Sequence, residues 1–131
     1  MKRMAFAPMA LLLSAAAPAQ AQQFPGQQFL DLCTSADAGS RGFCIGYLIG
    51  IIEGSGLGVS RALSVEEDST PEAPAIQRRI PATLGYCLPT GTDINTLPGV
   101  VIDFAAGKPE AARLPAAALV SDALISKYPC N

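Results

Sequence analysis

Residues 43–58 form the sequence Phe-Cys-Ile-Gly-Tyr-Leu-Ile-Gly-Ile-Ile-Glu-Gly-Ser-Gly-Leu-Gly, and we expect the other segments to pack around this apolar stretch. Its apolar residues recur at helical spacing with a second apolar edge beside them, which predicts a helix buried on more than one side. These residues are Phe43, Cys44, Tyr47, Leu48, Ile51 and Ile52 on one face, and Ile45 and Ile49 on the second edge.

Five glycines lie four residues apart along this predicted helix, at positions 42, 46, 50, 54 and 58. Each glycine costs about 1 kcal/mol relative to alanine inside a helix, so this ridge needs a physical reason. We expect a neighbouring helix to approach closely along it, and we predict that Gly46, Tyr47, Gly50 and Gly54 are the packing residues. Residues 54–58 are expected to be the frayed end of the helix.

Small residues four apart also mark the contacts of transmembrane helices. The apolar run extends only from Phe43 to Ile52 before Glu53 interrupts it, whereas a membrane span needs roughly 20 apolar residues. The length of the run therefore favours packing in a soluble domain, and no membrane insertion is expected once the N-terminal signal is removed.

The first 21 residues have the three parts of a secretory signal peptide. Lys2 and Arg3 supply positive charge, residues 9–17 form the apolar region, and Ala19-Gln20-Ala21 is the small-x-small cleavage site. Cleavage leaves residues 22–131 as a single domain, and no cysteine follows the site to carry a lipid. We expect export across the inner membrane, which means the periplasm in a Gram-negative cell.

The net charge of the chain argues against nucleic acid as a partner. The whole chain has a formal net charge of −2, and removal of Lys2 and Arg3 with the signal peptide makes the mature part more acidic. A nucleic-acid-binding domain needs a basic surface to replace the counterions of the phosphates.

Cys33, Cys44, Cys87 and Cys130 are the cysteines of the chain, and an even number in an exported protein predicts two disulfides. Their spacing allows three pairings and does not select one. If the last two predicted helices are antiparallel neighbours, Cys87 lies near Cys130. The same reasoning places Cys33, which ends the first helix, near Cys44, which begins the second; this pairing is our leading hypothesis.

Four helices are predicted in the mature domain. Residues 27–33 form a short helix that makes a hairpin with the helix of residues 43–58. A third helix starts at Thr96, which places Pro98 in its first turn, and a fourth follows the break at residues 107–110. The fold class is therefore all-α, a small four-helix, disulfide-bonded domain.

Residues 63–86 are predicted to form a long polar loop between the second and third helices. This segment contains Glu66, Glu67, Asp68 and Glu72 together with prolines and arginines, so it is too polar to bury. Its length is more than a passive connection needs, which indicates either a binding loop or local disorder.

No pattern in the sequence indicates catalysis or a cofactor. The chain has no histidine to act as a general base, and its cysteines are better explained as disulfides than as nucleophiles. A zinc site is disfavoured because there is no CxxC pair. We therefore predict no catalytic residue, no metal ligand and no cofactor.

Several short motifs, in their order along the chain, resemble the Rap/Tai family of immunity proteins. The resemblance covers about residues 29–130. It rests on Phe29-Leu30 with Cys33, Cys44-x-Gly46-Tyr47-x-x-Gly50 with Glu53, Cys87-Leu88-Pro89, Val100-Val101 before Lys108-Pro109-Glu110, Ala118-Leu119-Val120 with Ala123-Leu124, and Tyr128-Pro129-Cys130.

The resemblance implies a function as well as a fold. Members of the family are small, all-helical periplasmic proteins, commonly dimeric, that block peptidoglycan-cleaving amidase effectors of type VI secretion systems. It thus implies that the chain is not an enzyme, that its partner is a secreted peptidoglycan amidase effector, and that it forms a homodimer. The resemblance also implies inhibition by occlusion, in which a protruding segment of the immunity protein fills the effector's active-site cleft. We nominate Glu66, Glu67, Asp68 and Glu72 as partner-binding residues because their segment is polar and long enough to reach.

A periplasmic acid-stress chaperone of the Hde type is the alternative function. Such a chaperone is also small, helical and disulfide-bonded. Since the chain has no histidine, protonation of carboxylates would have to trigger the exposure of its apolar surface.

Overall fold

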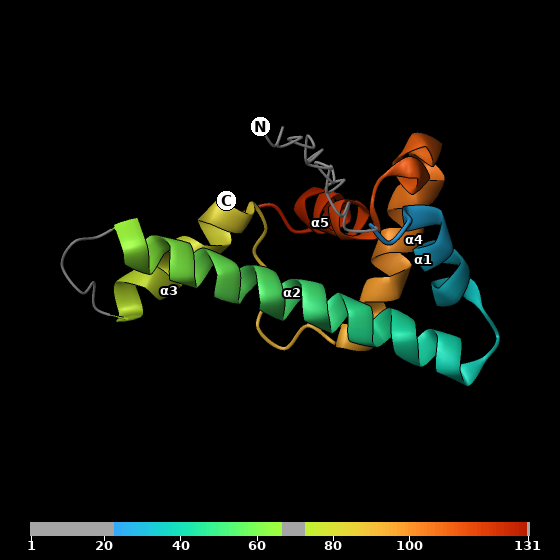
Figure 1. Ribbon diagram of the computed structural model, residues 1–131, viewed down its shortest axis with the longest axis horizontal. Helices are drawn as coiled ribbons and strands as arrows, with labels where there is room; N and C mark the ends of the chain where they lie inside the picture. The colour runs from blue at the N-terminus through green and yellow to red at the C-terminus, as the bar shows by residue number, and fades with distance from the viewer. Residues whose placement is uncertain (1–22, 67–72, 131) are drawn as a thin grey trace, which may run out of the picture.

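A computed structural model describes residues 23–66 and 73–130 of the chain (Figure 1). Within these ranges the secondary structure is helical apart from two isolated β-bridges, which confirms the all-α prediction. The described part has five α-helices and two short 3-10 helices where four helices were predicted. They are α1 (Gly26–Thr34), α2 (Ala38–Glu66), α3 (Ala73–Leu84), η1 (Ile94–Thr96), α4 (Leu97–Gly107), η2 (Pro109–Arg113) and α5 (Ala116–Lys127).

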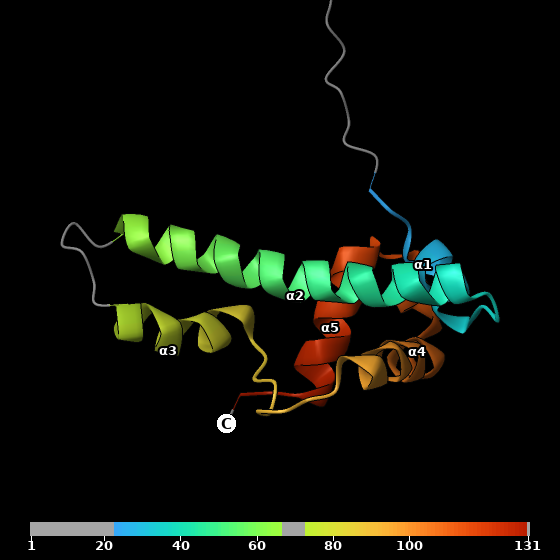
Figure 2. The same cartoon turned by 90° about the horizontal axis from the view of Figure 1, so that it is seen from below.

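The helices form two regions of different character. The first, which we call the head, contains α1, α4, α5, both 3-10 helices and the first part of α2, and each of these elements contacts at least two of the others around one core. The second, which we call the arm, contains residues 54–66 of α2 and the whole of α3. Among the described helices, α3 contacts α2 alone. Both views show the arm extending away from the head (Figures 1 and 2).

Helix α5 is the most deeply buried helix of the head. Its inward residues are completely inaccessible, and the alanines among them allow the neighbouring helices to approach closely. They are Ala116, Leu119, Val120, Ala123 and Leu124. Phe29 of α1, Leu48 of α2 and Val101 of α4 pack in the same core and are equally buried. Residues 43–58 contribute Cys44 and Leu48 to this core, but the prediction that their helix is buried on more than one side is wrong, since Phe43, Ile49 and Leu57 are exposed.

The two predicted disulfide pairs are confirmed. Cys33 is bonded to Cys44, which joins the last turn of α1 to the first part of α2. Cys87 is bonded to Cys130, which joins the segment that follows α3 to the end of the chain. Next to this second disulfide, Cys87 N–H donates to Tyr128 C=O at 2.8 Å. The arm thus returns to the head at a covalently closed point, which we call the root of the arm.

The predicted end of the second helix and the predicted long loop are both wrong. Helix α2 continues past Gly58 to Glu66, and α3 occupies most of the predicted loop of residues 63–86. The two helical segments are stabilised by packing against each other. Leu63 of α2 and Ile76 of α3 are both buried in the arm. Pro74 lies in the first turn of α3, where a proline is tolerated. Pro98 lies in the first turn of α4, as predicted.

The predicted close approach along the glycine ridge is wrong within the chain. A Cβ atom added at Gly42, Gly46, Gly50, Gly54 or Gly58 would meet no other atom within 4 Å. Tyr47 does pack, since its ring makes edge contacts with Phe24 and tilts against Phe29, and this burial raises the pKa of its hydroxyl. Helix α2 is therefore buried along one side only, and its glycine ridge faces open space.

Helix α2 begins at a side-chain cap. The Asp37 carboxylate accepts a hydrogen bond from Ser40 N–H at 2.7 Å and another from the Ser40 hydroxyl at 3.1 Å. These hydrogen bonds stabilise the charged form and hold the pKa of Asp37 below its usual value of 3.8. The cap fixes the start of the helix three residues after α1 ends.

Replacing each disulfide by two serines should destabilise the head by different amounts. In the chain-entropy model, the Cys33–Cys44 bond contributes about 3 kcal/mol and the Cys87–Cys130 bond about 4 kcal/mol, because the second closes the longer loop. Chemical denaturation of the double variants Cys33→Ser/Cys44→Ser and Cys87→Ser/Cys130→Ser measures the two losses. Peptide mapping without reduction checks the pairing, and a peptide that joins Cys33 to Cys87 or Cys130 would contradict it.

The Asp37 cap should give the protein a specific pH dependence. Because the folded-state pKa of Asp37 is lowered, the charged carboxylate stabilises the fold above the usual pKa of 3.8, and this stabilisation is lost as the pH falls through the lowered value. We expect Asp37→Ala to lower the melting temperature at neutral pH and the two proteins to converge in acid. Thermal melts across this range test it, with Asp103→Ala on α4 as the control. A gap in melting temperature that stays constant with pH would contradict the cap.

Candidate protein-binding surfaces

Nothing in the described residues forms a catalytic or metal-binding constellation. Residues 23–66 and 73–130 contain no group of three or more His, Cys, Asp or Glu residues that could hold a metal ion. They also contain no buried polar or charged side chain, and all four cysteines are in disulfides. The candidate sites of this part of the chain are a cavity and two surfaces.

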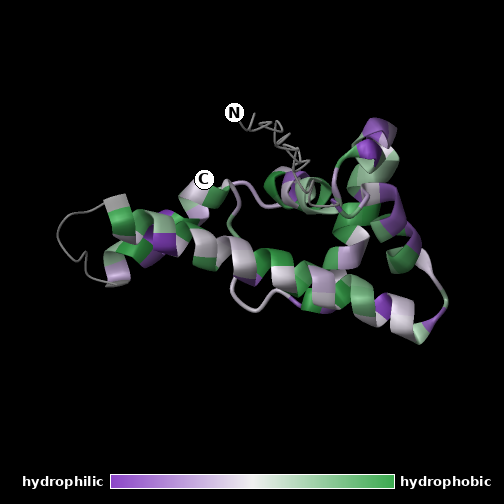
Figure 3. Ribbon diagram, in the orientation of Figure 1, coloured by the Kyte–Doolittle hydropathy of each residue, from purple (hydrophilic) through white to green (hydrophobic). Residues whose placement is uncertain are grey.

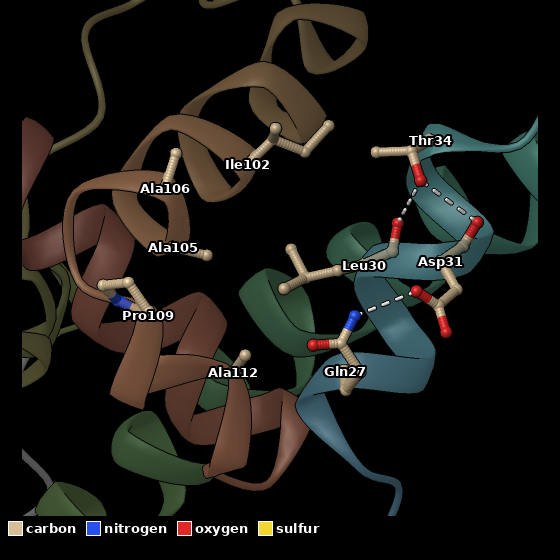
Figure 4. A pocket seen from close by; sticks show the side chains of 9 residues that line it. All are labelled: Gln27, Leu30, Asp31, Thr34, Ile102, Ala105, Ala106, Pro109 and Ala112. Atoms are coloured by element: carbon tan, nitrogen blue, oxygen red, sulfur yellow. Dashed lines mark hydrogen bonds between the residues drawn. The ribbon is translucent and has the colours of Figure 1, made fainter.

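A shallow cavity of about 370 Å³ lies between α1 and the α4–η2 region (Figure 4). Its polar side chains already bond one another or the backbone: Gln27 Nε2 donates to Asp31 Oδ1 at 2.9 Å, and Thr34 Oγ1 donates to Leu30 C=O at 2.9 Å. The rest of its lining comes from apolar side chains such as Leu30 and Ile102. The cavity thus offers a small ligand no convergent polar group by which it could be recognised.

One of the predicted partner-binding residues, Glu66, ends a helix at the far end of the arm. Glu66 is the last residue of α2, and α3 begins at Ala73. The ends of these two helices lie side by side at the point of the arm most distant from the head (Figures 1 and 2). Glu67, Asp68 and Glu72 lie outside the described residues, so their role stays a prediction.

The arm is supported along its length and at its root. Leu63 and Ile76 are buried between its two helices. At the root, the hydroxyls of Ser55 and Tyr86 are 3.4 Å apart, within hydrogen-bonding distance, and the Tyr86 side chain is buried in the core of the head. Tyr86 also forms a β-bridge with Pro129. These contacts hold the arm in a fixed direction from the head.

The exposed apolar side chains of α2 form a second candidate surface, and the sequence reasoning missed their exposure. Of the large apolar side chains that are exposed in the described part, all but Ile125 come from α2: Phe43, Ile49, Leu57 and Val65. Figure 3 shows hydrophobic and near-neutral residues alternating along α2 from the head into the arm. The glycines spaced four residues apart pointed to this surface, but we had predicted that another helix of the same chain packs on them.

The length and composition of α2 would also allow it to cross a membrane. The segment Ala38–Val65 is a helix of 28 residues. The argument that the apolar run is too short to span a membrane is therefore wrong. Only 11% of the most apolar stretch of this helix is buried in the fold. Three charged residues, Arg41, Glu53 and Arg61, lie along this segment. Cys44 and Leu48 also tie it to the head, which favours a helix of a folded domain.

The described residues define a class of protein: a small, disulfide-bonded, all-α protein whose most prominent surface features are an arm and the exposed apolar side chains of α2. A family model described as Rap1a immunity proteins matches residues 25–130. The chain therefore belongs to the Rap1a immunity protein family, which confirms the resemblance seen in the sequence. No curated protein and no solved structure matches the chain.

The burial of Leu63 predicts that the arm can be weakened separately from the head. Leu63→Ala removes a buried contact between α2 and α3 and should cost about 2 kcal/mol or more. Because the arm has little other core, we expect faster amide hydrogen exchange in residues 57–84 with little change in α5. Val65→Ala is the control: its side chain is 85% exposed, so a change within about 0.5 kcal/mol is expected. Equal effects of the two substitutions would contradict the described packing of the arm.

Proposed function

We propose that this chain is a periplasmic immunity protein that binds a peptidoglycan amidase effector of a type VI secretion system and occludes its active-site cleft. Membership of the Rap1a immunity protein family supports an immunity function. The family match begins at residue 25, just after the predicted signal-peptide cleavage site at Ala21. The two disulfides suit an oxidising compartment such as the periplasm.

The observation that carries the mechanism is the position of the arm. An inhibitor that fills a cleft needs a narrow element that extends beyond its own body, and the arm is the described element with this shape (Figure 2). Of the acidic residues, Glu66 ends α2, and Glu67, Asp68 and Glu72 follow it in the sequence before α3 begins at Ala73. In this proposal they enter the cleft, and the cell's own peptidoglycan is protected because substrate can no longer reach the catalytic groups.

The helices of the arm also lower the cost of binding. A connection whose ends are already held close together by α2 and α3 has less conformational entropy to lose on binding than a free loop. The buried pair Leu63 and Ile76 holds those ends together. The Cys87–Cys130 disulfide and the buried Tyr86 side chain attach the root of the arm to the head. In this proposal, the head thereby sets the position of the tip.

The acid-stress chaperone has no comparable support. Such a chaperone needs carboxylates whose protonation releases buried apolar surface, yet the described part of the chain has no buried charged side chain. A dye that binds apolar surface gives the check. A large rise in dye fluorescence on acidification would favour the chaperone over the immunity protein.

The partner can be identified by capture with the mature chain, residues 22–131, with its disulfides intact. Proteins from the secreted and envelope fractions of the source cell are passed over the immobilised chain, and any stoichiometric companion is identified. The proposal expects a peptidoglycan amidase whose activity falls on binding. Recovery of a broad mixture of unfolded envelope proteins, increasing at acid pH, would contradict it.

Neutralising these acidic residues should weaken inhibition of that amidase without unfolding the protein. The variant carries Glu66→Gln, Glu67→Gln, Asp68→Asn and Glu72→Gln, and we expect the inhibition constant to rise by at least tenfold, since several charged contacts would be lost. The control neutralises four carboxylates of the head: Asp31→Asn, Asp103→Asn, Glu110→Gln and Asp122→Asn. Equal inhibition by both variants would contradict the role of the tip.

The proposed function includes the homodimer that family resemblance implies.

A further inference from the structure

Helix α2 is held by buried side chains at one point in the head and at another in the arm, but not between them. Leu48 is completely buried in the head, and Leu63 is buried in the arm. All residues between these two are described, and none of them is buried. Ile51 and Ile52 pack partly against the core of the head. The support that the core gives to α2 therefore ends close to residue 54, where the arm begins.

The part of α2 that leaves the head has a weakened helical backbone. Residues 54–58 contain three glycines, and each one costs helix stability relative to alanine because its backbone loses more conformational freedom. A Cβ atom at any of the three would meet no other atom within 4 Å, so close packing does not explain them. Within this stretch, the Ser55 hydroxyl donates to Ile52 C=O at 3.2 Å. A hydrogen bond of this kind often bends a helix.

The returning side of the arm is weakened at about the same level. Pro81 lies inside α3, where it has no N–H to donate and its ring disturbs the preceding turn. Gly85, directly after α3, has a φ of +81°, which favours glycine. The Ser55 and Tyr86 hydroxyls are 3.4 Å apart and so place the two sides next to each other. Counting from this contact, Pro81 lies about level with residue 60 of α2.

The course of α2 agrees with these local features. In Figure 2, the part of α2 beside α3 is inclined to the part that lies along the head. Bends in long helices are characteristic of neighbouring glycine and serine residues, and residues 54–58 have the sequence Gly-Ser-Gly-Leu-Gly. We call the weakened positions on both sides of the arm the joint. The joint consists of Gly54, Gly56, Gly58, Pro81 and Gly85.

We propose that the joint is a hinge at which the arm changes its direction relative to the head, and that the hydrogen bond between Ser55 and Tyr86 is its latch. In a hinge, a few residues absorb the change in backbone angles while the elements on both sides stay rigid. The latch connects α2 to a side chain in the core of the head, and its length of 3.4 Å makes it weak enough to open. Both disulfides lie on the head side of the joint, so neither has to break.

The hinge adjusts the arm to the direction of the cleft that it enters, without repacking of the head. In the free chain the closed latch keeps the arm in one direction, and contact with the cleft supplies the energy that opens it. This use of the hinge rests on the proposed function. The hinge itself is a property of the free chain and is tested without the amidase.

Distances between the head and the arm of the mature chain test the hinge. Spin labels are carried by non-canonical residues in place of Val65 on the arm and Asp103 on the head, which are both exposed, so the native disulfides stay intact. Double electron–electron resonance gives the distribution of the distance between the labels. Tyr86→Phe removes the hydroxyl of the latch and keeps the buried ring, so we expect a broader distribution than in the wild type.

Two sets of glycine-to-alanine substitutions, each added to the Tyr86→Phe chain, locate the hinge. The joint set should restore the narrow distribution, because alanine stiffens the helix. The control set lies in the same helix at equally open positions and raises the helix propensity by the same amount, but it should leave the distribution broad. The joint set is Gly54→Ala, Gly56→Ala and Gly58→Ala, and the control set is Gly42→Ala, Gly46→Ala and Gly50→Ala.

The outcomes separate the hinge from the proposed function. A Tyr86→Phe chain with the wild-type distribution overturns the latch, and a distribution that narrows equally in both sets, or in neither, overturns the hinge. Amidase inhibition is then measured with each set in the wild-type background, and the joint set should inhibit more weakly than the control set. Equal inhibition by the two sets overturns the use of the hinge in binding. Failure to recover any amidase contradicts the proposed function and leaves the distance result standing.

Discussion

The disulfide between Cys33 and Cys44 is the attachment on which the rest of the structure depends. It fixes the first part of α2 to the end of α1, and Leu48, one turn further on, is completely buried in the core of the head. Because α2 is one continuous helix from Ala38 to Glu66, holding its first part sets the direction of its far end. The orientation of the arm is thus determined inside the head, about 27 Å from the tip at 1.5 Å per residue between residues 48 and 66.

The second disulfide closes the arm where it returns. Cys87 and Cys130 join the segment after α3 to the segment after α5, and Tyr86 is buried in the core next to Cys87. With both ends of the arm anchored to the head, its two helices pack along each other and bury Leu63 of α2 and Ile76 of α3. A small domain can therefore carry an extended element without a second core, which is the property that an inhibitor of a cleft would use.

Local signals in the sequence were enough to predict the disulfide pairs and the start of α4, but not the packing of α2 and α3. The disulfide pairs followed from cysteines at helix ends, and Pro98 marked the first turn of α4. The long loop of residues 63–86 was predicted wrongly because charge and proline dominate its composition, whereas the pairing of Leu63 with Ile76 depends on a contact between two helices. Residues 43–58 were predicted to form the central helix of the core because apolar residues surround their glycines. The most deeply buried helix is instead the alanine-rich α5. The acidic tip was nominated from composition, and its role stays a prediction.

Amide hydrogen exchange of the mature chain, alone and in complex with the captured amidase, tests the central claim most directly. If the arm is the inhibitory element, binding should slow exchange at the end of α2, in residues 67–72 and at the start of α3, while the cavity-lining residues of α1 and α4 stay unchanged. Protection confined to α1, α4 or α5, with no change at the tip of the arm, would contradict the account.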